Sequence, residues 1–234
     1  TLPTIKGEKV VLRILDKSNL KVNLESLELN PTASKQLHKI LNQPYGLILV
    51  TGPTGSGKTT SVYSMINYLN TMARNIVTIE DPVEYRFPVI NQVQVNNKIE
   101  FTFAAALRTI LRQDPDIIMI GEIRDRETAE IAVRAALTGH LVISTMHTND
   151  APSAVTRFVD MGIEPFFVSS SLLGVLSQRL VRQLCEHCKT THTVAGPERA
   201  SYLQDIVLKG GTYCEPKGCE KCFGFGYSGR SAIF

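Results

Sequence analysis

One stretch of the sequence has the residue types and the spacing that hold a phosphate chain: Gly52-Pro53-Thr54-Gly55-Ser56-Gly57-Lys58-Thr59-Thr60. It matches the pattern G-x-x-x-x-G-K-[ST] at every defined position. The glycines let backbone N–H groups approach phosphate oxygens, Lys58 would place a cation against the β- and γ-phosphates, and the Thr59 hydroxyl would ligate Mg²⁺. A glycine-rich turn without a ligand is the alternative. The apolar strand expected at 47–51 and the helix expected at 59–69 favour a nucleoside triphosphate site.

Carboxylates follow two apolar segments, and a phosphate-loop ATPase needs one carboxylate for Mg²⁺ and another for the attacking water. The apolar segment 117–120 is followed by Gly121 and Glu122, and we predict Glu122 on the Mg²⁺ side. The second segment leads into Glu80, Asp81 and Glu84, whose charges repel one another unless a cation or protons relieve them. A solvated acidic turn is the alternative for this second group.

His147 follows another apolar segment, residues 141–145, and would lie at the same edge of the sheet. A histidine there can donate to a γ-phosphate or report its loss. A capping or packing histidine is the alternative. His140, at the other end of the segment, would face away from the nucleotide, and we expect a structural role for it.

Strands and helices alternate through the middle of the chain. Continuous apolar runs such as 116–121 are typical of parallel strands that are covered on both faces. The alternation predicts an α/β fold with a doubly wound parallel sheet and ligands at the carboxyl ends of its strands. We expect strands at 8–15, 47–51, 76–79, 116–121 and 141–145, and helices at 32–41, 59–69, 102–112, 126–137, from Asn149 or Asp150 onward, and within 164–184.

Two C-x-x-C pairs, Cys185 with Cys188 and Cys219 with Cys222, predict a Cys₄ zinc site. Residues 189–218, 30 in all, separate the pairs, which is longer than a common zinc ribbon, but added loop length costs little closure entropy. Disulfides and a redox pair are the alternatives. A cytosolic setting disfavours the first, and neither pair opens a thioredoxin-like βαβ unit.

The composition, with 43% hydrophobic and 20% charged residues in a chain of 234, is ordinary for a soluble globular protein. The net charge of +3 does not by itself indicate nucleic acid or a membrane surface. We find no apolar run long enough for a membrane helix and nothing like a signal peptide, so we expect a cytoplasmic protein. Because the chain begins at Thr1 and ends abruptly at Phe234, we expect a fragment of a longer protein.

Four segments in this order resemble the Walker A, Asp box, Walker B and His box of the secretion-superfamily ATPases: 52–60, 80–85, 121–125 and 138–149. The resemblance extends over essentially the whole chain and is strongest to the assembly ATPases of type II secretion and type IV pili. It implies a RecA-like P-loop NTPase core at 31–183, after the end of a truncated N-terminal domain at 1–30. A small zinc-binding subdomain and the start of a further segment would occupy 184–234.

The resemblance also implies roles for the candidate residues. Glu84 becomes the candidate for the carboxylate that activates the water, with Glu80 and Asp81 in support, and His147 joins the catalytic set. The family supplies arginines from the preceding domain, and Arg13 lies in the strand-like segment that resembles that region. Other arginines of that domain would precede Thr1, so the activity of the fragment alone is an open question.

The resemblance implies partners as well. The assembly ATPases form cytoplasmic homo-hexameric rings at the inner face of the membrane, where they act on an inner-membrane platform protein and adaptors. They carry a four-cysteine zinc module, which the retraction ATPases lack, so the cysteines favour assembly. ATP, Mg²⁺ and Zn²⁺ are the expected ligands, and pseudopilus assembly in type II secretion is preferred over type IV pilus extension.

Two other functions remain open at this point. A nucleic-acid-translocating ATPase would use arginines such as Arg108, Arg112 and Arg134, but acidic residues alternate with them and suit ion pairs better than a phosphate track. There is also no aromatic platform near them on which bases could stack. A nucleotide-dependent scaffold without catalysis would bind ATP and not turn it over.

Overall fold

The computed structural model describes residues 1–12, 22–193 and 212–234. These residues fall into two compact units: residues 1–178 together with Phe234, and residues 179–233. The domain boundaries expected from the sequence, at residues 30 and 183, stay predictions. Arg13 lies outside the described residues.

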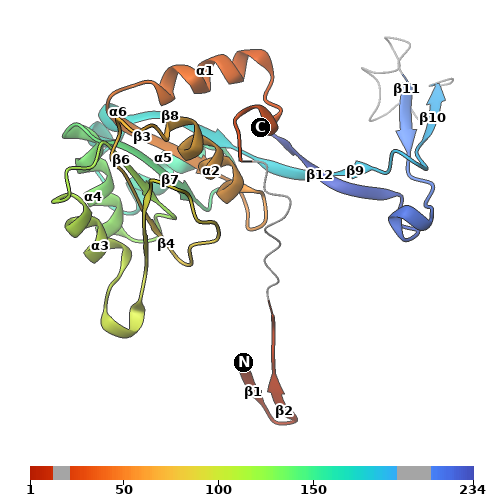
Figure 1. The fold of residues 1–234 in the computed structure, drawn as a ribbon, viewed down its shortest axis with the longest axis horizontal. Helices are drawn as coiled ribbons and strands as arrows, with labels where there is room; N and C mark the ends of the chain where they lie inside the picture. The colour runs from red at the N-terminus through yellow and green to blue at the C-terminus, as the bar shows by residue number, and fades with distance from the viewer. Residues whose placement is uncertain (13–21, 194–211) are drawn as a thin grey trace. The chain divides into compact units, whose positions relative to one another are not determined.

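A six-stranded parallel sheet forms the centre of the first unit, in the order β5-β4-β6-β7-β3-β8 (Figure 1). The doubly wound sheet expected from the alternation of elements is therefore confirmed. Its strands are β3 (Gly46–Thr51), β4 (Ile76–Glu80), β5 (Asn91–Gln94), β6 (Ile117–Ile120), β7 (Leu141–Met146) and β8 (Leu172–Ser177).

Helices cover both faces of this sheet (Figure 1). On one face lie α1 (Pro31–Leu41) and α2 (Lys58–Leu69), and on the other lie α3 (Phe103–Ile110), α4 (Arg126–Leu137), α5 (Ala151–Asp160) and α6 (Pro165–Ser171). Short 3₁₀ turns occupy η1 (Glu25–Leu27) and η2 (Asn97–Ile99).

Strand β3 shows why the sequence builds three layers. All six of its residues are buried, and successive side chains of a strand point to opposite faces. Leu47 and Leu49 pack into the cluster with α3 to α6, whereas Ile48 and Val50 pack into the cluster with α1 and α2. A strand with apolar residues on both faces needs a helical layer on each, which is what the continuous apolar run predicts.

The helix starts follow local capping chemistry. The side chain of Asp150 accepts a hydrogen bond from the Ser153 N–H at 2.8 Å, so Asp150, one of the two expected residues, is the N-cap of α5. Asp125 caps α4 in the same way through the Thr128 N–H. Gly57, with φ of 86°, stands at the N-cap of α2 without a side-chain cap, which leaves the first N–H groups of that helix to a ligand.

Two expectations from the sequence are confirmed only in part. The segment 164–184 contains one helix, α6, but it ends at Ser171: Leu172–Ser177 is strand β8, which pairs in parallel with β3, and Arg179–Leu184 is strand β9. A short apolar run does not distinguish strand from helix, and here pairing with β3 decides. Of the strand expected at 8–15, residues 8 and 9 belong to β2 (Gly7–Lys9), which pairs with β1 (Leu2–Thr4), and residues 10–12 have no regular structure. Residues 13–15 lie outside the described residues.

The second unit contains small antiparallel pairs. Strand β9 (Arg179–Leu184) pairs with β12 (Tyr227–Ile233), and β10 (Thr190–Thr193) pairs with β11 (Thr212–Glu215). A 3₁₀ turn, η4 (Glu220–Cys222), contains Cys222 and has Cys219 as its N-cap. Across the described ranges of both units, no helix has the length and the apolar character needed to cross a membrane.

Candidate nucleotide site and candidate metal centre

The strand register brings the predicted nucleotide-site residues of the first unit to one edge of the sheet. Thr51, the last residue of β3, is paired with Met146 of β7, so the phosphate loop and His147 start side by side. Ile120 of β6 is paired with Ser144 of β7 and with Ile79 of β4. Glu80, the last residue of β4, and the loop that carries Glu122 therefore lie at the same carboxyl edge, where ligands of doubly wound sheets bind.

The phosphate loop has the backbone that its glycines predict. Gly52, Gly55 and Gly57 have φ values of 146°, 79° and 86°, which side chains rarely allow. A Cβ at Gly55 would meet nothing within 4 Å, so open space for a ligand adjoins the loop there. A Cβ at Gly52 would come within 2.3 Å of the carbonyl of Gln178, which explains why only glycine fits.

Lys58 is the first residue of α2 and is only 8% exposed. Its ammonium donates to the carbonyls of Gly52 at 2.8 Å and Pro53 at 3.0 Å, so the lysine folds over its own loop. Burial lowers the pKa of Lys58 below its usual value, and the nearby carboxylate of Glu122 works in the opposite direction.

His147 stands between Lys58 and Glu122. Its Nδ1 lies 3.4 Å from the Lys58 ammonium and its Nε2 lies 3.4 Å from a carboxylate oxygen of Glu122. The same carboxylate oxygen pairs with the guanidinium of Arg124. The three residues, which the sequence predicts separately, thus lie in one row, with the imidazole of His147 between the ammonium of Lys58 and the carboxylate of Glu122.

Glu80 and Glu84 differ in their surroundings. The Glu80 side chain is 3% exposed and accepts hydrogen bonds from Tyr63, Thr78 and Gln92. Glu84 is half-buried in the turn after β4, and its N–H donates to the Tyr63 hydroxyl at 3.2 Å. Glu80 is therefore built into the fold, whereas Glu84 lies on a surface segment beside it.

Gln178, which directly follows β8, holds the phosphate loop by hydrogen bonds, a role that the sequence did not predict. Its amide accepts from the Ser61 hydroxyl at 2.6 Å and donates to the Ser56 carbonyl at 2.6 Å, while its side chain is 2% exposed. Ser56 lies 122 positions earlier, and no local pattern signals so distant a contact.

Two buried side-chain hydroxyls of the described residues lack a hydrogen-bond partner, and both lie at this loop: those of Thr51 and Ser56. Buried polar groups are normally satisfied, so unpaired ones mark a place where a ligand or water completes the site. Together with the open space at Gly55, they show that the loop fits a bound phosphate chain.

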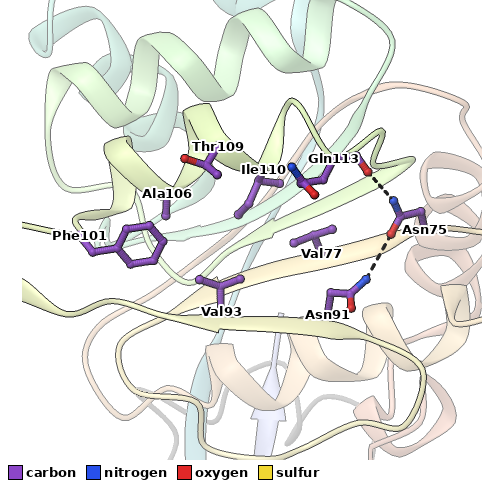
Figure 2. A pocket seen from close by; sticks show the side chains of 9 residues that line it. All are labelled: Asn75, Val77, Asn91, Val93, Phe101, Ala106, Thr109, Ile110 and Gln113. Carbon is purple, nitrogen blue, oxygen red and sulfur yellow. Dashed lines mark hydrogen bonds between the residues drawn. The ribbon is translucent and has the colours of Figure 1, made fainter.

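A hollow of about 350 Å³ lies elsewhere in the first unit, between α3 and the strands β4 and β5 (Figure 2). Its polar rim includes Asn75 and Asn91, which precede β4 and open β5, and their amides are hydrogen-bonded to each other. The hollow therefore lies toward the amino ends of these strands, away from the phosphate loop. A second hollow, of about 360 Å³, is lined by Asp81, Arg124 and Asp125 at the carboxyl edge.

Two arginines of α3 and α4, Arg108 and Arg126, form ion pairs within the chain. Arg108 pairs with Glu127 across α3 and α4, and Arg126 pairs with Glu130 one turn along α4 at 2.7 Å. Both pairs are exposed to solvent. Their charges are compensated by neighbours, which is the arrangement that disfavours a continuous phosphate track.

The four predicted cysteine ligands gather in the second unit, with all four sulfur atoms within 4.8 Å of one another. The sulfurs of Cys188 and Cys222 are 3.8 Å apart, and those of Cys219 and Cys222 are 3.7 Å apart. Four sulfurs at about 2.3 Å from a tetrahedral zinc ion lie about 3.8 Å from one another. The cluster therefore fits a Cys₄ metal centre, and all four thiols are free of disulfides.

Backbone donors favour a thiolate within this cluster. Burial raises the pKa of Cys222, but the N–H groups of Cys219 and Gly226, which donate to its sulfur at 3.1 and 3.2 Å, act together with the thiols of Cys219 and Cys188 to lower the pKa to about 6. Burial and the neighbouring thiols raise the pKa of Cys188 to about 11. A cation would be needed to hold all four sulfurs as thiolates at neutral pH.

Comparison with known proteins assigns the chain to a family. The sequence model of the family described as Type II/IV secretion system protein matches residues 1–234. The chain belongs to this family. It is 54% identical over 233 residues to Type II secretion system protein E of Dickeya dadantii, and 53% identical over 235 residues to the Type IV pilus assembly ATPase PilB of Thermus thermophilus.

These alignments cover the whole chain but only part of each relative: 46% of the Dickeya protein and 26% of the Thermus protein. The chain thus spans less than half the length of these relatives. A crystal structure of the pilus retraction motor PilT with bound ADP is similar in fold, with a TM-score of 0.63 and 44% identity over 70% of this chain and 50% of that one. The expected RecA-like P-loop fold and the family resemblance are confirmed.

Proposed function

We propose that this chain is the catalytic part of a Mg²⁺-dependent ATPase motor that drives pseudopilus assembly in type II protein secretion. The family match and the 54% identity to a type II secretion system protein E support this assignment. The substrate is ATP, and the reaction is hydrolysis of the bond to its γ-phosphate.

In this mechanism the phosphate loop binds and orients ATP. N–H groups of Gly55 and Gly57 face the phosphates, and the ammonium of Lys58 exchanges the carbonyls of Gly52 and Pro53 for phosphate oxygens. A bound Mg²⁺ would neutralise charge on the phosphates, and the Thr59 hydroxyl and Glu122 are the residues that would hold it.

Glu84 accepts a proton from the attacking water in the proposed reaction, because its segment follows β4 at the carboxyl edge of the sheet and its side chain, unlike that of the buried Glu80, is partly open to solvent. His147 senses the γ-phosphate, since it already lies between Lys58 and Glu122. Arg13 would add positive charge at the phosphates, and Glu80 supports Glu84 from within the fold.

The observation that carries the proposal is the row of Lys58, His147 and Glu122. Each contact in this row is 3.4 Å long, and the row lies at the carboxyl edge of the sheet beside a glycine loop with free helix N–H groups. A cation, an imidazole and a carboxylate at a phosphate loop suit hydrolysis of a triphosphate better than simple structural packing.

The proposal extends to the assembly that the family resemblance implies. The motor would be a homo-hexamer at the inner face of the cell membrane, in contact with an inner-membrane platform protein and adaptors, with no direct role for nucleic acid. The four-cysteine cluster would bind Zn²⁺ as a closed structural site that takes no part in hydrolysis.

Phosphate release by the intact protein, with whatever sequence flanks these residues, tests the proposal. Lys58→Ala is expected to abolish ATP binding and turnover, because the phosphates lose their cation. Glu84→Gln is expected to bind ATP normally and to lower kcat by about 10²- to 10⁴-fold, the usual contribution of a general base. The measurements are steady-state phosphate release and equilibrium binding of ATP.

Lys39→Ala is the matched control, since Lys39 is an exposed lysine of α1 in the same unit, and it should leave both quantities unchanged. A wild-type protein that binds ATP without turnover in its assembled state would point to a scaffold. Stimulation of turnover by DNA at low salt would point to a nucleic-acid motor.

Type IV pilus extension is the second candidate, because identity to the pilus assembly ATPase of Thermus, 53%, is nearly equal to the identity to the secretion protein. Deletion of the gene in its own cell separates the two. Loss of protein export with pili intact supports secretion, and loss of pili with export intact supports extension.

A further inference from the structure

The hydroxyl of Tyr63 is a buried junction between the helix that begins at Lys58 and the segment that carries Glu84. Tyr63 lies on α2 and is 1% exposed. Its hydroxyl donates to a carboxylate oxygen of Glu80 and accepts the N–H groups of Glu84 at 3.2 Å and Tyr85 at 3.4 Å. One donor and two acceptor positions are the full capacity of a phenol, so every one is used.

In the hydrogen bond between Tyr63 and Glu80, the phenol is the donor and the carboxylate is the acceptor. Its second oxygen accepts from the Thr78 hydroxyl at 2.6 Å and from the Gln92 amide at 3.1 Å. Burial, and then the hydrogen bond to Glu80, raise the pKa of Tyr63, so the phenol keeps its proton at any physiological pH. Tyr63 is thus held as a donor toward Glu80 and as an acceptor toward the turn.

Strand β5 holds the same turn from the other side. Gln92 donates to the Tyr85 carbonyl at 2.9 Å and accepts the Phe87 N–H at 2.7 Å. The side chain of Gln94 accepts the Val83 N–H at 3.2 Å. The backbone on both sides of Glu84 is therefore fixed by side chains, and Tyr63 is the one that reaches it from α2.

We propose that the Tyr63 hydroxyl is a positioning group for ATP hydrolysis, which ties the segment around Glu84 to α2 so that the carboxylate keeps a fixed place relative to the phosphate loop. This inference rests on the proposed function of Glu84. Tyr63 itself is buried and acts through the backbone of Glu84 and Tyr85. The proposed role belongs to the hydroxyl and not to the ring. A phenylalanine at this position would fill the same space and keep the edge contact with Phe87, whose ring centre lies 5.1 Å away, but it would lose the hydrogen bonds.

The test uses Tyr63→Phe in the intact protein, with Tyr68→Phe as the matched control. Tyr68 is on the same helix but 40% exposed, and its hydroxyl contacts the Asn42 amide at 3.3 Å. Tyr63→Phe is expected to lower kcat by about 10- to 100-fold while KM and the Kd for ATP stay within about twofold, because positioning enters the reaction and not the binding of the nucleotide. Tyr68→Phe should match wild type.

Two further measurements separate positioning from a general structural role. In Glu84→Gln, adding Tyr63→Phe should cause no further loss of kcat, because the two changes act through one group. Hydrogen exchange should show that the amides of Glu84 and Tyr85 lose protection in Tyr63→Phe, while those of β3 and β7 keep it.

Each outcome decides. An unchanged kcat in Tyr63→Phe, a parallel loss of kcat and ATP affinity, or an equal further loss in the Glu84→Gln background would each overturn the inference. Wild-type turnover in Glu84→Gln would instead overturn the proposed function of Glu84. The exchange measurement would still report whether the anchor exists.

Discussion

The two units of the chain differ in how much apolar surface they bury. In the first unit, all six residues of β3 and all six of β7 are buried, and two apolar clusters lie on the faces of the sheet. In the described part of the second unit, the buried residues are Cys185, Cys222 and Gly226, while strands β9 and β12 are exposed or half-buried throughout.

This difference shows which interactions each unit depends on. Apolar burial contributes roughly 25 cal/mol per Å², so the two apolar clusters are the main source of stability in the first unit. The described part of the second unit contains almost no buried apolar side chain, and its buried side chains are those of two cysteines of the four-cysteine cluster. Small modules of this kind usually need a metal or disulfides, and these thiols form no disulfide.

The largest expected effect is therefore on the second unit, when the zinc ion proposed for its four cysteines is removed. Cys222→Ser, or dialysis against a strong chelator, should release one zinc ion per chain and unfold the described residues of the second unit, 179–193 and 212–233, because zinc binding supplies about 10–16 kcal/mol in isolated zinc-finger peptides. Metal analysis and hydrogen exchange on the intact protein measure the two effects. The strands of the central sheet should keep their protection.

Cys214→Ser provides the control within the same unit. Cys214 lies on β11, outside the cluster of four, and its sulfur contacts the Thr191 hydroxyl at 3.5 Å. Its loss should change neither zinc content nor exchange. Full protection of residues 179–193 and 212–233 in metal-free protein would contradict the comparison, since the second unit would then be stable without a metal.

A smaller loss of stability is expected when Gln178 is replaced, because its buried side chain makes two polar contacts within the first unit. Gln178→Ala leaves the Ser61 hydroxyl and the Ser56 carbonyl without their partner in a buried place. Each unsatisfied group costs about 1–3 kcal/mol, so we expect the free energy of unfolding of the first unit to fall by about 2–6 kcal/mol. ATP affinity should fall as well, because the phosphate loop loses its support. Urea unfolding and ATP titration measure both.

Gln36→Ala, at an exposed glutamine of α1, is the matched control and should be neutral within about 0.5 kcal/mol. Gln178→Glu refines the test, because a carboxylate still accepts from Ser61 but cannot donate to Ser56. If Gln178→Ala costs less than the control range, the loop does not depend on this residue.

The sequence predicts most of the fold because its signals are local. The helix at 126–137 begins at a capping aspartate and ends where expected, and the strand at 46–51 follows from its apolar run. Residues 172–177 could not be assigned in the same way, because their apolar run suits a helix or a strand equally well. Only pairing with β3, a contact with a distant part of the chain, makes them a strand.

The candidate site divides in the same manner. Lys58, Glu122 and His147 could be predicted because each follows a strand in a recognisable segment, and the parallel register then brings them together. Gln178 and Tyr63 could not, since their importance comes from hydrogen bonds to residues far along the chain or within a turn of irregular shape. Buried polar partners of this kind leave no periodic trace in a sequence.

The smallest effect is expected at the surface of the first unit, where charge replaces burial. Arg108 and Glu127 join α3 to α4, yet their side chains are 55% and 59% exposed. Exposed ion pairs contribute about 0–1 kcal/mol, so Glu127→Gln should change the free energy of unfolding by less than about 0.5 kcal/mol, and less again in high salt. Urea unfolding at two salt concentrations measures this. A loss above about 2 kcal/mol would mean that this pair is buried against another surface in the assembled protein, because only a desolvated pair costs that much to break.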